Sequence, residues 1–314
     1  MALDKNIAVL IGGVGGAKLA SGLVEAVPPE RLTFIVNTGD DFWHLGLKIC
    51  PDIDTLMYTL SCLVNPELGW GIADDTTAAL DSLARHYQVE PWFRLGDQDL
   101  ATHILRTHWL RRGRSLTAVT TCLAERLGLR TAILPMSDDE VPTMVNTIER
   151  GELGFQEYFV KYAWSPVIRS IRHQGCEKAR LSQPAQAALT EADIVLIAPS
   201  NPWLSLAPIL AIPGLRDLLT RLTAPVVAVT PIIAGDAVKG PTAKIMRELG
   251  LQVSARAVAR FYGGLIDGFV DDRRNEPFEI EGLRTIQLNT LMNNQADKVA
   301  LARALLDWIV RWAR

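Results

Sequence analysis

A cluster of four glycines stands near the start of this 314-residue chain, at Gly12, Gly13, Gly15 and Gly16. The wholly apolar run at residues 7–11 before it is typical of a strand covered on both faces. Glycines at a strand–helix turn let backbone N–H groups approach a ligand closely, and the N-terminus of the following helix favours an anion. The cluster therefore predicts a phosphate-binding turn, with a tight turn that holds no ligand as the alternative.

Two common nucleotide-binding patterns do not fit this turn. A G-x-G-x-x-G pattern that starts at Gly13 places Lys18 where the third glycine belongs. A P-loop needs Gly-Lys followed by Ser or Thr, whereas Lys18 lies between Ala17 and Leu19. The sequence disfavours a standard nicotinamide oxidoreductase and a P-loop kinase. The glycines and Lys18 remain candidates to bind a nucleotide that the turn does not name.

Strand and helix patterns alternate along most of the chain, which predicts an α/β fold of Rossmann-like type, with a mostly parallel sheet and helices on both faces. We expect a single composite domain over residues 1–314. Segments 155–162 and 167–172 predict strands of a small inserted subregion near residues 140–185. Because ligands bind at the carboxyl ends of parallel strands, the loops at that edge are the candidate site.

Charge and apolar patterning exclude several other classes of protein. The 32 basic and 35 acidic side chains give a net charge of −3, which argues against a general nucleic-acid binder. No apolar stretch approaches the roughly 18 residues of a membrane span, and the N-terminus lacks a signal-peptide pattern. The four cysteines form no Cys-x-x-Cys pair. We expect a cytoplasmic protein that acts on small molecules, without a membrane or nucleic-acid partner.

Four carboxylates follow the second predicted strand within fifteen positions, at Asp40, Asp41, Asp52 and Asp54. They repel one another beside a predicted phosphate loop unless a cation or hydrogen-bond donors offset them. Mg²⁺ is commonly bound by one or two carboxylates, water and substrate phosphates. All four are candidate Mg²⁺ ligands, while the alternative is that they cap helices or face solvent.

Further polar candidates come from two other loops. Arg94 can hold a phosphate or face solvent, and His103 stands four residues after Asp99, a spacing that allows a contact on one helix face. Ser200 and Asn201 follow the strongest apolar strand of the second half and can contact a base or a phosphate. No Ser-His-Asp pattern or reactive cysteine environment supports covalent catalysis.

Together these loops resemble the 2-phospho-L-lactate transferase family of deazaflavin coenzyme F420 biosynthesis. The resemblance covers nearly the whole chain, and its specificity lies in the conjunction of motifs that are weak alone. The matching segments are residues 12–18, 37–41, 49–55, 69–71, 95–103, 134–139, 198–202 and 231–235.

The resemblance implies a Mg²⁺-dependent transfer of a phospho-(hydroxy)acid unit from a guanosine diphosphate ester to the ribityl hydroxyl of the deazaflavin Fo, with GMP leaving. It implies acceptor contacts at Asp54 and Arg94, the proposed catalytic residues, and we expect Asp97 and His103 to contact the acceptor as well. The family's Gly-Asp-Arg-Asp segment reads Gly-Asp-Gln-Asp here, with Gln98 in place of the arginine. A homodimer is also implied.

One alternative from a different class is a nucleotide-sugar-binding regulatory protein of the gluconeogenesis-factor type, which resembles this chain in its first loop. The segment from Cys50 to Asp54 together with Arg94 favours the transferase, because a pure binding protein needs no acceptor site. The sequence leaves the transferred acid open among 2-phospholactate, phosphoenolpyruvate and phosphoglycerate.

Overall fold

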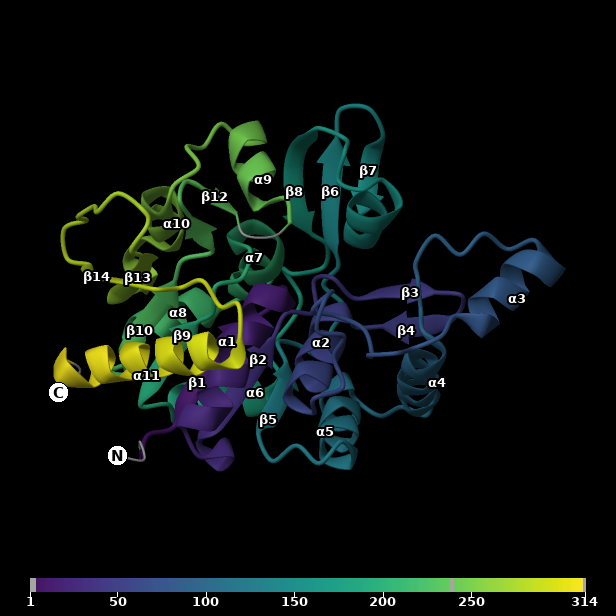
Figure 1. The fold of residues 1–314 in the computed structure, drawn as a ribbon, viewed down its shortest axis with the longest axis horizontal. Coiled ribbons are helices and arrows are strands. Elements are labelled where there is room, and N and C mark those ends of the chain that lie inside the picture. The colour runs from purple at the N-terminus through teal and green to yellow at the C-terminus, as the bar shows by residue number, and fades with distance from the viewer. Residues whose placement is uncertain (1–3, 238–239, 313–314) are drawn as a thin grey trace.

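A seven-stranded sheet, parallel throughout, forms the centre of the protein in the computed structural model, which describes residues 4–237 and 240–312 (Figure 1). The parallel α/β fold that the alternating pattern predicts is confirmed. In spatial order the strands are β14 (Arg284–Leu288), β13 (Gly268–Asp272), β10 (Val226–Val229), β9 (Ile194–Ile197), β1 (Ile7–Ile11), β2 (Leu32–Val36) and β5 (Ala132–Pro135).

Strand β1 lies at the middle of the sheet, where the direction of winding changes. From β1 the chain moves to β2 and β5 on one side, then crosses to β9 on the other side. Ile7 of β1 pairs with Leu32 of β2 and with Ile194 of β9. The loops after β1, β2 and β9 therefore leave the same edge of the sheet side by side, at a position where open α/β sheets bind ligands.

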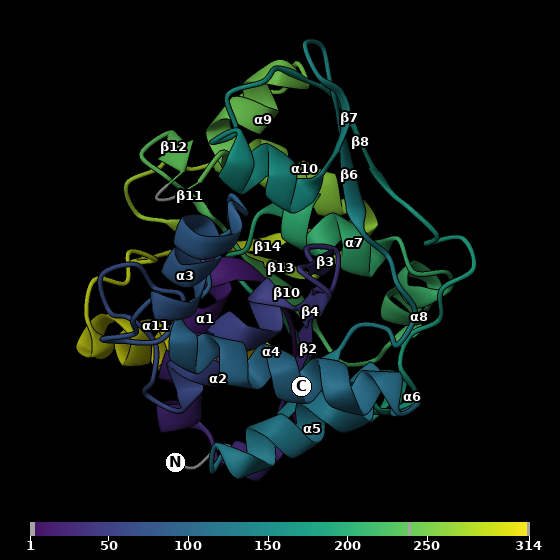
Figure 2. The same cartoon turned by 90° about the vertical axis from the view of Figure 1, so that its right-hand side faces the viewer.

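Helices cover both faces of the sheet, because alternate residues of each strand point to opposite sides. Ile7, Val9 and Ile11 join one apolar core, whereas Ala8 and Leu10 join the other. The first core contains α1 (Gly13–Ala26), α2 (Pro51–Leu60), α5 (Leu116–Arg126) and α11 (Gln295–Trp312). The second contains α6 (Gln183–Thr190), α7 (Ala207–Leu210), α8 (Leu215–Arg221), α9 (Thr242–Glu248) and α10 (Ala255–Tyr262) (Figure 2).

A three-stranded antiparallel sheet follows β5, in the order β7 (Gly151–Gly154), β6 (Thr143–Thr147), β8 (Ile168–His173). The predicted strand at residues 155–162 is wrong, because a helical turn occupies Glu157–Lys161. Phe155 and Tyr158 are both buried in the second core, at the three-residue spacing of a helix face. The continuous apolar and aromatic run concealed this period.

The segment between β2 and β5 extends to one side of the sheet (Figure 1). It contains a hairpin of β3 (Phe42–His44) and β4 (Leu47–Ile49), then α2, α3 (Ala78–Tyr87) and α4 (Asp97–Arg111). The hairpin is tied to α4 because Lys48 N donates to Thr107 Oγ1 at 2.8 Å. The remaining elements are β11 (Ile232–Ile233), β12 (Asp236–Ala237) and the helical turns Pro29–Arg31, Pro202–Leu206 and Gly263–Leu265.

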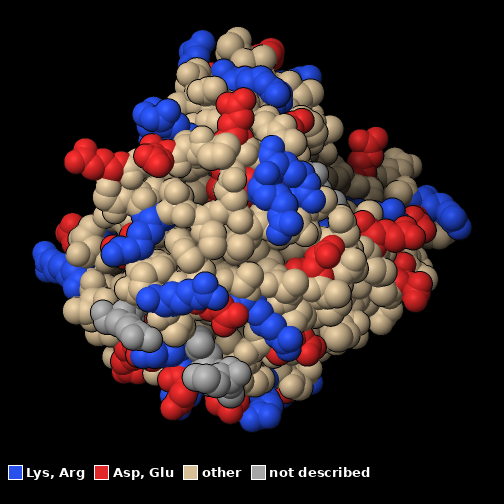
Figure 3. All heavy atoms as spheres, turned by 60° about the vertical axis from the view of Figure 1, so that its left-hand side comes forward, with Lys and Arg blue, Asp and Glu red and all other residues tan. Residues whose placement is uncertain are grey.

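The surface carries both signs of charge. On the face in Figure 3, basic and acidic side chains are interspersed among the described residues, without one extended basic area. None of the helices in residues 4–237 and 240–312 has the length and apolar character needed to cross a membrane.

Candidate functional site

A cavity of about 620 Å³ opens at the carboxyl edge of the sheet. Its lining comes from the turn between β1 and α1, the N-terminal half of α2, one face of α4, the inserted segment after β7, and the loops after β9, β10 and β14. Of the residues predicted from sequence, it contains Gly12, Gly13, Gly15, Lys18, Asp40, Asp52, Asp54, Arg94, His103, Ser200 and Asn201. Three others, Gly16, Asp41 and Asp97, are not part of the lining.

The glycine turn forms the floor of this cavity and the first turn of α1. The helix begins at Gly13, which has a φ of +63° that favours glycine. A Cβ on Gly15 would lie 2.5 Å from the carbonyl oxygen of Pro199 in the loop after β9. The glycines thus bring the N–H groups of α1 to the cavity surface, an arrangement that suits an anion.

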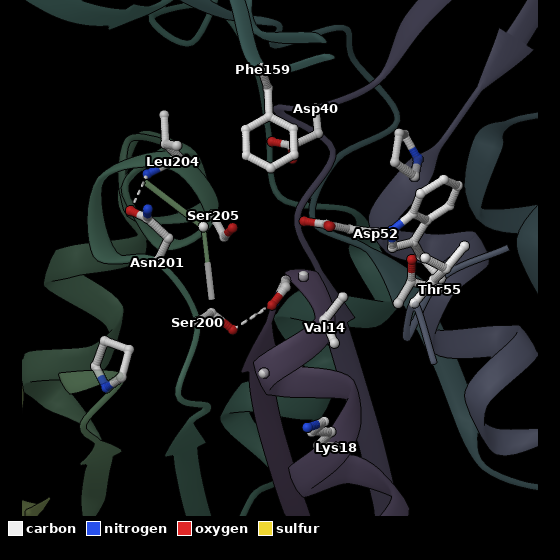
Figure 4. A pocket seen from close by; sticks show the side chains of 18 of the residues that line it. Val14, Lys18, Asp40, Asp52, Thr55, Phe159, Ser200, Asn201, Leu204 and Ser205 are labelled. Carbon is white, nitrogen blue, oxygen red and sulfur yellow. Dashed lines mark hydrogen bonds between the residues drawn. The ribbon is translucent and has the colours of Figure 1, made fainter. Parts of the chain in front are cut away.

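Ser200 joins the glycine turn to the loop after β9. Its hydroxyl accepts from Gly12 N at 3.1 Å and donates to Gly12 O at 2.6 Å. Asn201 Oδ1 accepts from Trp203 N and Leu204 N, and its amide donates to Thr242 Oγ1 (Figure 4). These contacts shape the floor, so a ligand would meet backbone and hydroxyl groups whose positions are already fixed.

Lys18 reaches from α1 to the loop after β14. Its ammonium donates to the carbonyl oxygen of Met292 at 3.0 Å. Lys18 and residues 290–293 all line the cavity, so this contact connects the floor with one wall.

Asp40 and Asp52 form the most acidic part of the cavity. Asn37 Nδ2 donates to Asp40 Oδ1 and to Asp52 Oδ2, each at 2.9 Å. Figure 4 shows both carboxylates turned toward the space between Phe159 and Val14. Burial raises the pKa of Asp52 to about 6, and burial together with repulsion from Asp52 raises the pKa of Asp40 well above its usual range. Among the described residues, no cationic side chain donates a hydrogen bond to either carboxylate.

That deficit suits a divalent cation, although the protein alone does not supply a full set of ligands. Within residues 4–237 and 240–312, no three histidine, cysteine or acidic side chains are grouped to hold a metal ion. Mg²⁺ typically takes one or two carboxylates and completes its shell with water and substrate phosphates. Asp40 and Asp52 beside the glycine turn fit that pattern.

Asp41 faces a different cavity. It lines a second space of about 340 Å³, together with Lys48 and Glu140. Burial raises the pKa of Asp41 to about 7, against the lowering effect of nearby Lys48. Neighbouring carboxylates in one loop thus point to opposite sides, and Asp41 is not grouped with Asp40 and Asp52.

Asp54 is held by an arginine that sequence reasoning missed. Arg106 of α4 is fully buried and donates to both oxygens of Asp54, through Nη1 to Oδ2 at 3.0 Å and through Nη2 to Oδ1. The same Nη1 lies 3.1 Å from His103 Nδ1. Burial lowers the pKa of Arg106, but the charge of Asp54 outweighs that effect and the pKa is raised overall. The spacing could have identified Arg106, because residues 99, 103 and 106 share one face of a helix.

Asp99 completes this buried polar group, whereas Asp97 does not join it. Asp99 Oδ1 accepts from Tyr58 Oη at 2.7 Å and lies 3.2 Å from His103 Nε2. Asp97 instead accepts from the backbone N–H groups of Ala78 and Ala79 at the start of α3. It stabilises the N-terminal end of α3.

Arg94 and a set of aromatic side chains make the outer wall. The Arg94 side chain is exposed at the cavity and has no hydrogen bond or ion pair with any described residue. Aromatic rings from separate segments face the same space, which can take a flat, largely apolar ligand. They are Trp70, Phe93, Phe155, Phe159 and Trp164.

Fold and cavity together define an α/β protein with a binding cavity at one edge of a parallel sheet. A glycine turn at a helix N-terminus forms the cavity floor, an acidic pair lies beside it, and aromatic rings form the outer wall. The model of the family described as 2-phospho-L-lactate transferase CofD matches residues 7–305. The chain belongs to this transferase family, as its motifs indicated.

Similar proteins agree with this membership. A phosphoenolpyruvate transferase of Streptomyces griseus is 41% identical over 310 residues, covering 96% of this chain and 98% of that protein. A phosphoenolpyruvate transferase of Mycobacterium leprae is 40% identical, covering 92% and 94%. A crystal structure of a UPF0052 family protein from Bacillus halodurans matches with a TM-score of 0.61 at 16% identity, over 96% of this chain and 98% of that one. The last likeness shows the fold alone.

Proposed function

We propose that this protein transfers a phosphoenolpyruvate unit from its guanosine diphosphate ester to the ribityl hydroxyl of the deazaflavin Fo, releasing GMP in the biosynthesis of coenzyme F420. The observation that carries the proposal is the single cavity that joins the glycine turn and the Asp40–Asp52 pair to Asp54, Arg94 and the aromatic wall. Similarity to proteins named phosphoenolpyruvate transferases supports this acid over phospholactate and phosphoglycerate.

The residues divide into a donor side and an acceptor side. The N–H groups at Gly12, Gly13 and Gly15 bind the diphosphate, with Ser200 and Asn201 holding the floor around it. Asp40 and Asp52 hold Mg²⁺, which when bound neutralises diphosphate charge and makes the phosphorus more electrophilic. Because phosphoryl-type transfer depends on positioning and charge neutralisation, it needs no covalent nucleophile on the chain.

On the acceptor side, aromatic rings hold the deazaflavin plane and leave its ribityl chain directed toward Asp54. Asp54 orients the hydroxyl and accepts its proton. Arg94, with no protein partner among the described residues, contacts the acceptor or the charge that develops on the transferred phosphate. Asp97 is no longer proposed as an acceptor contact, because the start of α3 occupies its oxygens.

A direct assay tests the proposal. Purified protein is incubated with Fo, Mg²⁺ and the guanylylated three-carbon acids in competition, and the products are analysed by mass spectrometry. We expect GMP and the enolpyruvyl adduct of Fo as the main products. No adduct with any of the three donors, together with tight binding of a uridine-diphosphate sugar and none of Fo, would favour the regulatory alternative.

Two expectations are tested separately. A homodimer is checked by size-exclusion chromatography with light scattering. The end of α11 at Trp308 and Trp312 is one candidate dimer contact. Within the protomer the two rings pack on each other and against Gly268, so they are partly covered before any dimer forms. A cytoplasmic location is checked by cell fractionation.

A further inference from the structure

The face of α4 that meets α2 carries a group of polar side chains in close contact, and all of them except Arg106 line the cavity. Asp99, His103 and Arg106 contribute from α4, and Asp54 and Tyr58 from α2. An ion pair this deeply buried loses much of its Coulombic gain to desolvation, and an apolar pair of similar volume is often as stable. Stability alone therefore does not explain why an arginine with no exposed surface occupies this position.

Arg106 fixes the orientation of the Asp54 carboxylate. Its planar guanidinium contacts both carboxylate oxygens, so the carboxylate cannot rotate without breaking a charge-assisted hydrogen bond. A carboxylate offers about four lone-pair positions, of which this fork uses two. Asp54 also lines the cavity, whereas Arg106 does not. The remaining lone pairs of Asp54 can therefore accept a hydrogen bond from a hydroxyl in the cavity.

The same guanidinium determines which nitrogen of His103 carries its proton. An arginine N–H only donates, so His103 Nδ1, 3.1 Å from Arg106 Nη1, must be the acceptor and lacks a proton. The proton is then on Nε2, which lies 3.2 Å from Asp99 Oδ1. His103 Nδ1 is 3.7 Å from Asp54 Oδ2, too far for a hydrogen bond. With Nδ1 accepting from Arg106 and the proton on Nε2, neither ring nitrogen has a lone pair left for a substrate proton.

We propose that Arg106 is a positioning residue that holds Asp54 in the one orientation able to accept the hydroxyl proton, and that His103 braces this pair and is not the base. The proposal rests on the proposed function. The hydroxyl oxygen forms a bond to the distal phosphorus, and the bond from that phosphorus to the oxygen of GMP breaks. GMP leaves with the bonding electron pair, and the hydroxyl proton passes to Asp54. Arg106 remains a cation throughout.

Kinetics of three variants test the coupling. Asp54→Asn and Arg106→Met should each lower kcat by about a hundredfold or more, the range expected for loss or misplacement of a general base. KM for the donor should stay unchanged. The double variant D54N/R106M should lose no more than D54N, because both changes remove one unit. Additive losses, or an R106M variant with wild-type kcat, would overturn the proposal.

Arg106→Lys separates positioning from simple charge balance. Lysine restores the cation but lacks the two-pronged contact, so kcat should remain low while the thermal midpoint returns toward that of wild type. Full recovery of kcat in R106K would overturn the positioning role. If R106M fails to fold, R106K and the charge-balanced D54N/R106M still give the comparison. Arg112→Met, at an exposed position just beyond the same helix, is the matched control and should leave kcat unchanged.

A spectroscopic measurement tests the proposed role of His103 without any substrate. In ¹⁵N-histidine-labelled protein, assigned by loss of its signals in H103Q, the His103 ring should appear neutral with its proton on Nε2. In R106M the proton should redistribute between the two nitrogens. A protonated ring, or a proton on Nδ1 in the wild type, would refute the network even if no transfer activity is found. Failure of the proposed function would instead appear as a wild type that makes no adduct.

Discussion

Asn37 holds two carboxyl groups together with one amide group, at a cost in free energy because both groups are buried. Asp40 and Asp52 are both more than nine-tenths buried, and neither accepts a hydrogen bond from a cationic side chain of the residues that the structure describes. Burial and repulsion between the two carboxylates raise the pKa of Asp40, and Asn37 offsets this only by donating hydrogen bonds. We interpret this cost as one that cation binding removes.

Replacing Asp52 by Asn should therefore separate stability from activity. Loss of a buried charge whose pKa is raised to about 6 should increase the free energy of unfolding by roughly 1–3 kcal/mol, at about 1.4 kcal/mol per pKa unit. Activity should fall by about a hundredfold or more, because charge neutralisation in the cavity is lost. Urea unfolding and the transfer assay check both. Asp307→Asn, on the exposed side of α11, is the control, and a D52N variant that is both less stable and fully active would contradict the interpretation.

At the scale of elements, α1 and the loop after β9 approach so closely that only glycine fits between them. Gly15→Ala places its Cβ 2.5 Å from a backbone carbonyl oxygen, which cannot move as a side-chain end can. We expect a loss of about 1–3 kcal/mol in the free energy of unfolding, as for overpacking elsewhere. Gly264→Ala, where the new Cβ meets no atom within 4 Å, should change stability far less. Equal effects in denaturant titrations would argue against the close approach.

A second element-scale prediction concerns Asp272 at the end of β13. Burial raises the pKa of this carboxyl, but hydrogen bonds from Arg274 and Thr290 outweigh that effect and lower it below 3.8. A lowered pKa in the folded state means that the stabilisation is present above pH 3.8 and is lost as the pH falls through the folded value. Asp272→Asn should cost about 1.5–3 kcal/mol at pH 7.

The pH dependence of unfolding provides the check. The difference in unfolding free energy between wild type and D272N should shrink below pH 3.8, because the protonated carboxyl no longer accepts these bonds as an anion. A difference that is constant from pH 7 to pH 3 would contradict this origin. Since Thr290 lines the cavity, D272N should also weaken nucleotide binding at neutral pH.

Individual helices and strands also show how much of the fold can be predicted from the sequence. Strands such as β1 and β9 are readable because a fully buried parallel strand needs an unbroken apolar run. The helical turn at Glu157–Lys161 cannot be read in the same way, because aromatic residues occur in both strands and helices. Here packing against the second core determines that the segment is helical. Asp40 and Asp41 follow one strand together, yet loop side chains have no fixed period, so which cavity each faces depends on the fold. The position of Arg106 on the helix face of Asp99 and His103 could be predicted from their spacing. Its contact with Asp54 could not, because the two residues lie 52 positions apart in the sequence.

For the whole molecule, ligand binding should appear as linked stabilisation. In the proposed site, two carboxylates would leave coordination positions on Mg²⁺ that a diphosphate and water would fill, so Mg²⁺ and GDP together should raise the thermal midpoint by more than the sum of their separate effects. Differential scanning fluorimetry with each ligand alone, both, and both with EDTA measures this. EDTA should return the midpoint to the value with GDP alone. Purely additive shifts would place the cation away from the diphosphate.

The hydroxyl of Ser200 has a wider consequence. Because this hydroxyl forms hydrogen bonds with both the N–H and the carbonyl of Gly12, it joins the ends of β1 and β9 at one point. Gly12 and Ser200 are 188 positions apart in the sequence. The floor of the cavity thus lies at the middle of the sheet, while much of its wall comes from α2, α4 and the segment after β7, which are not part of the sheet. In the proposed site, exchanging wall residues should therefore change which acid and which acceptor are chosen, while the diphosphate keeps its position on the floor.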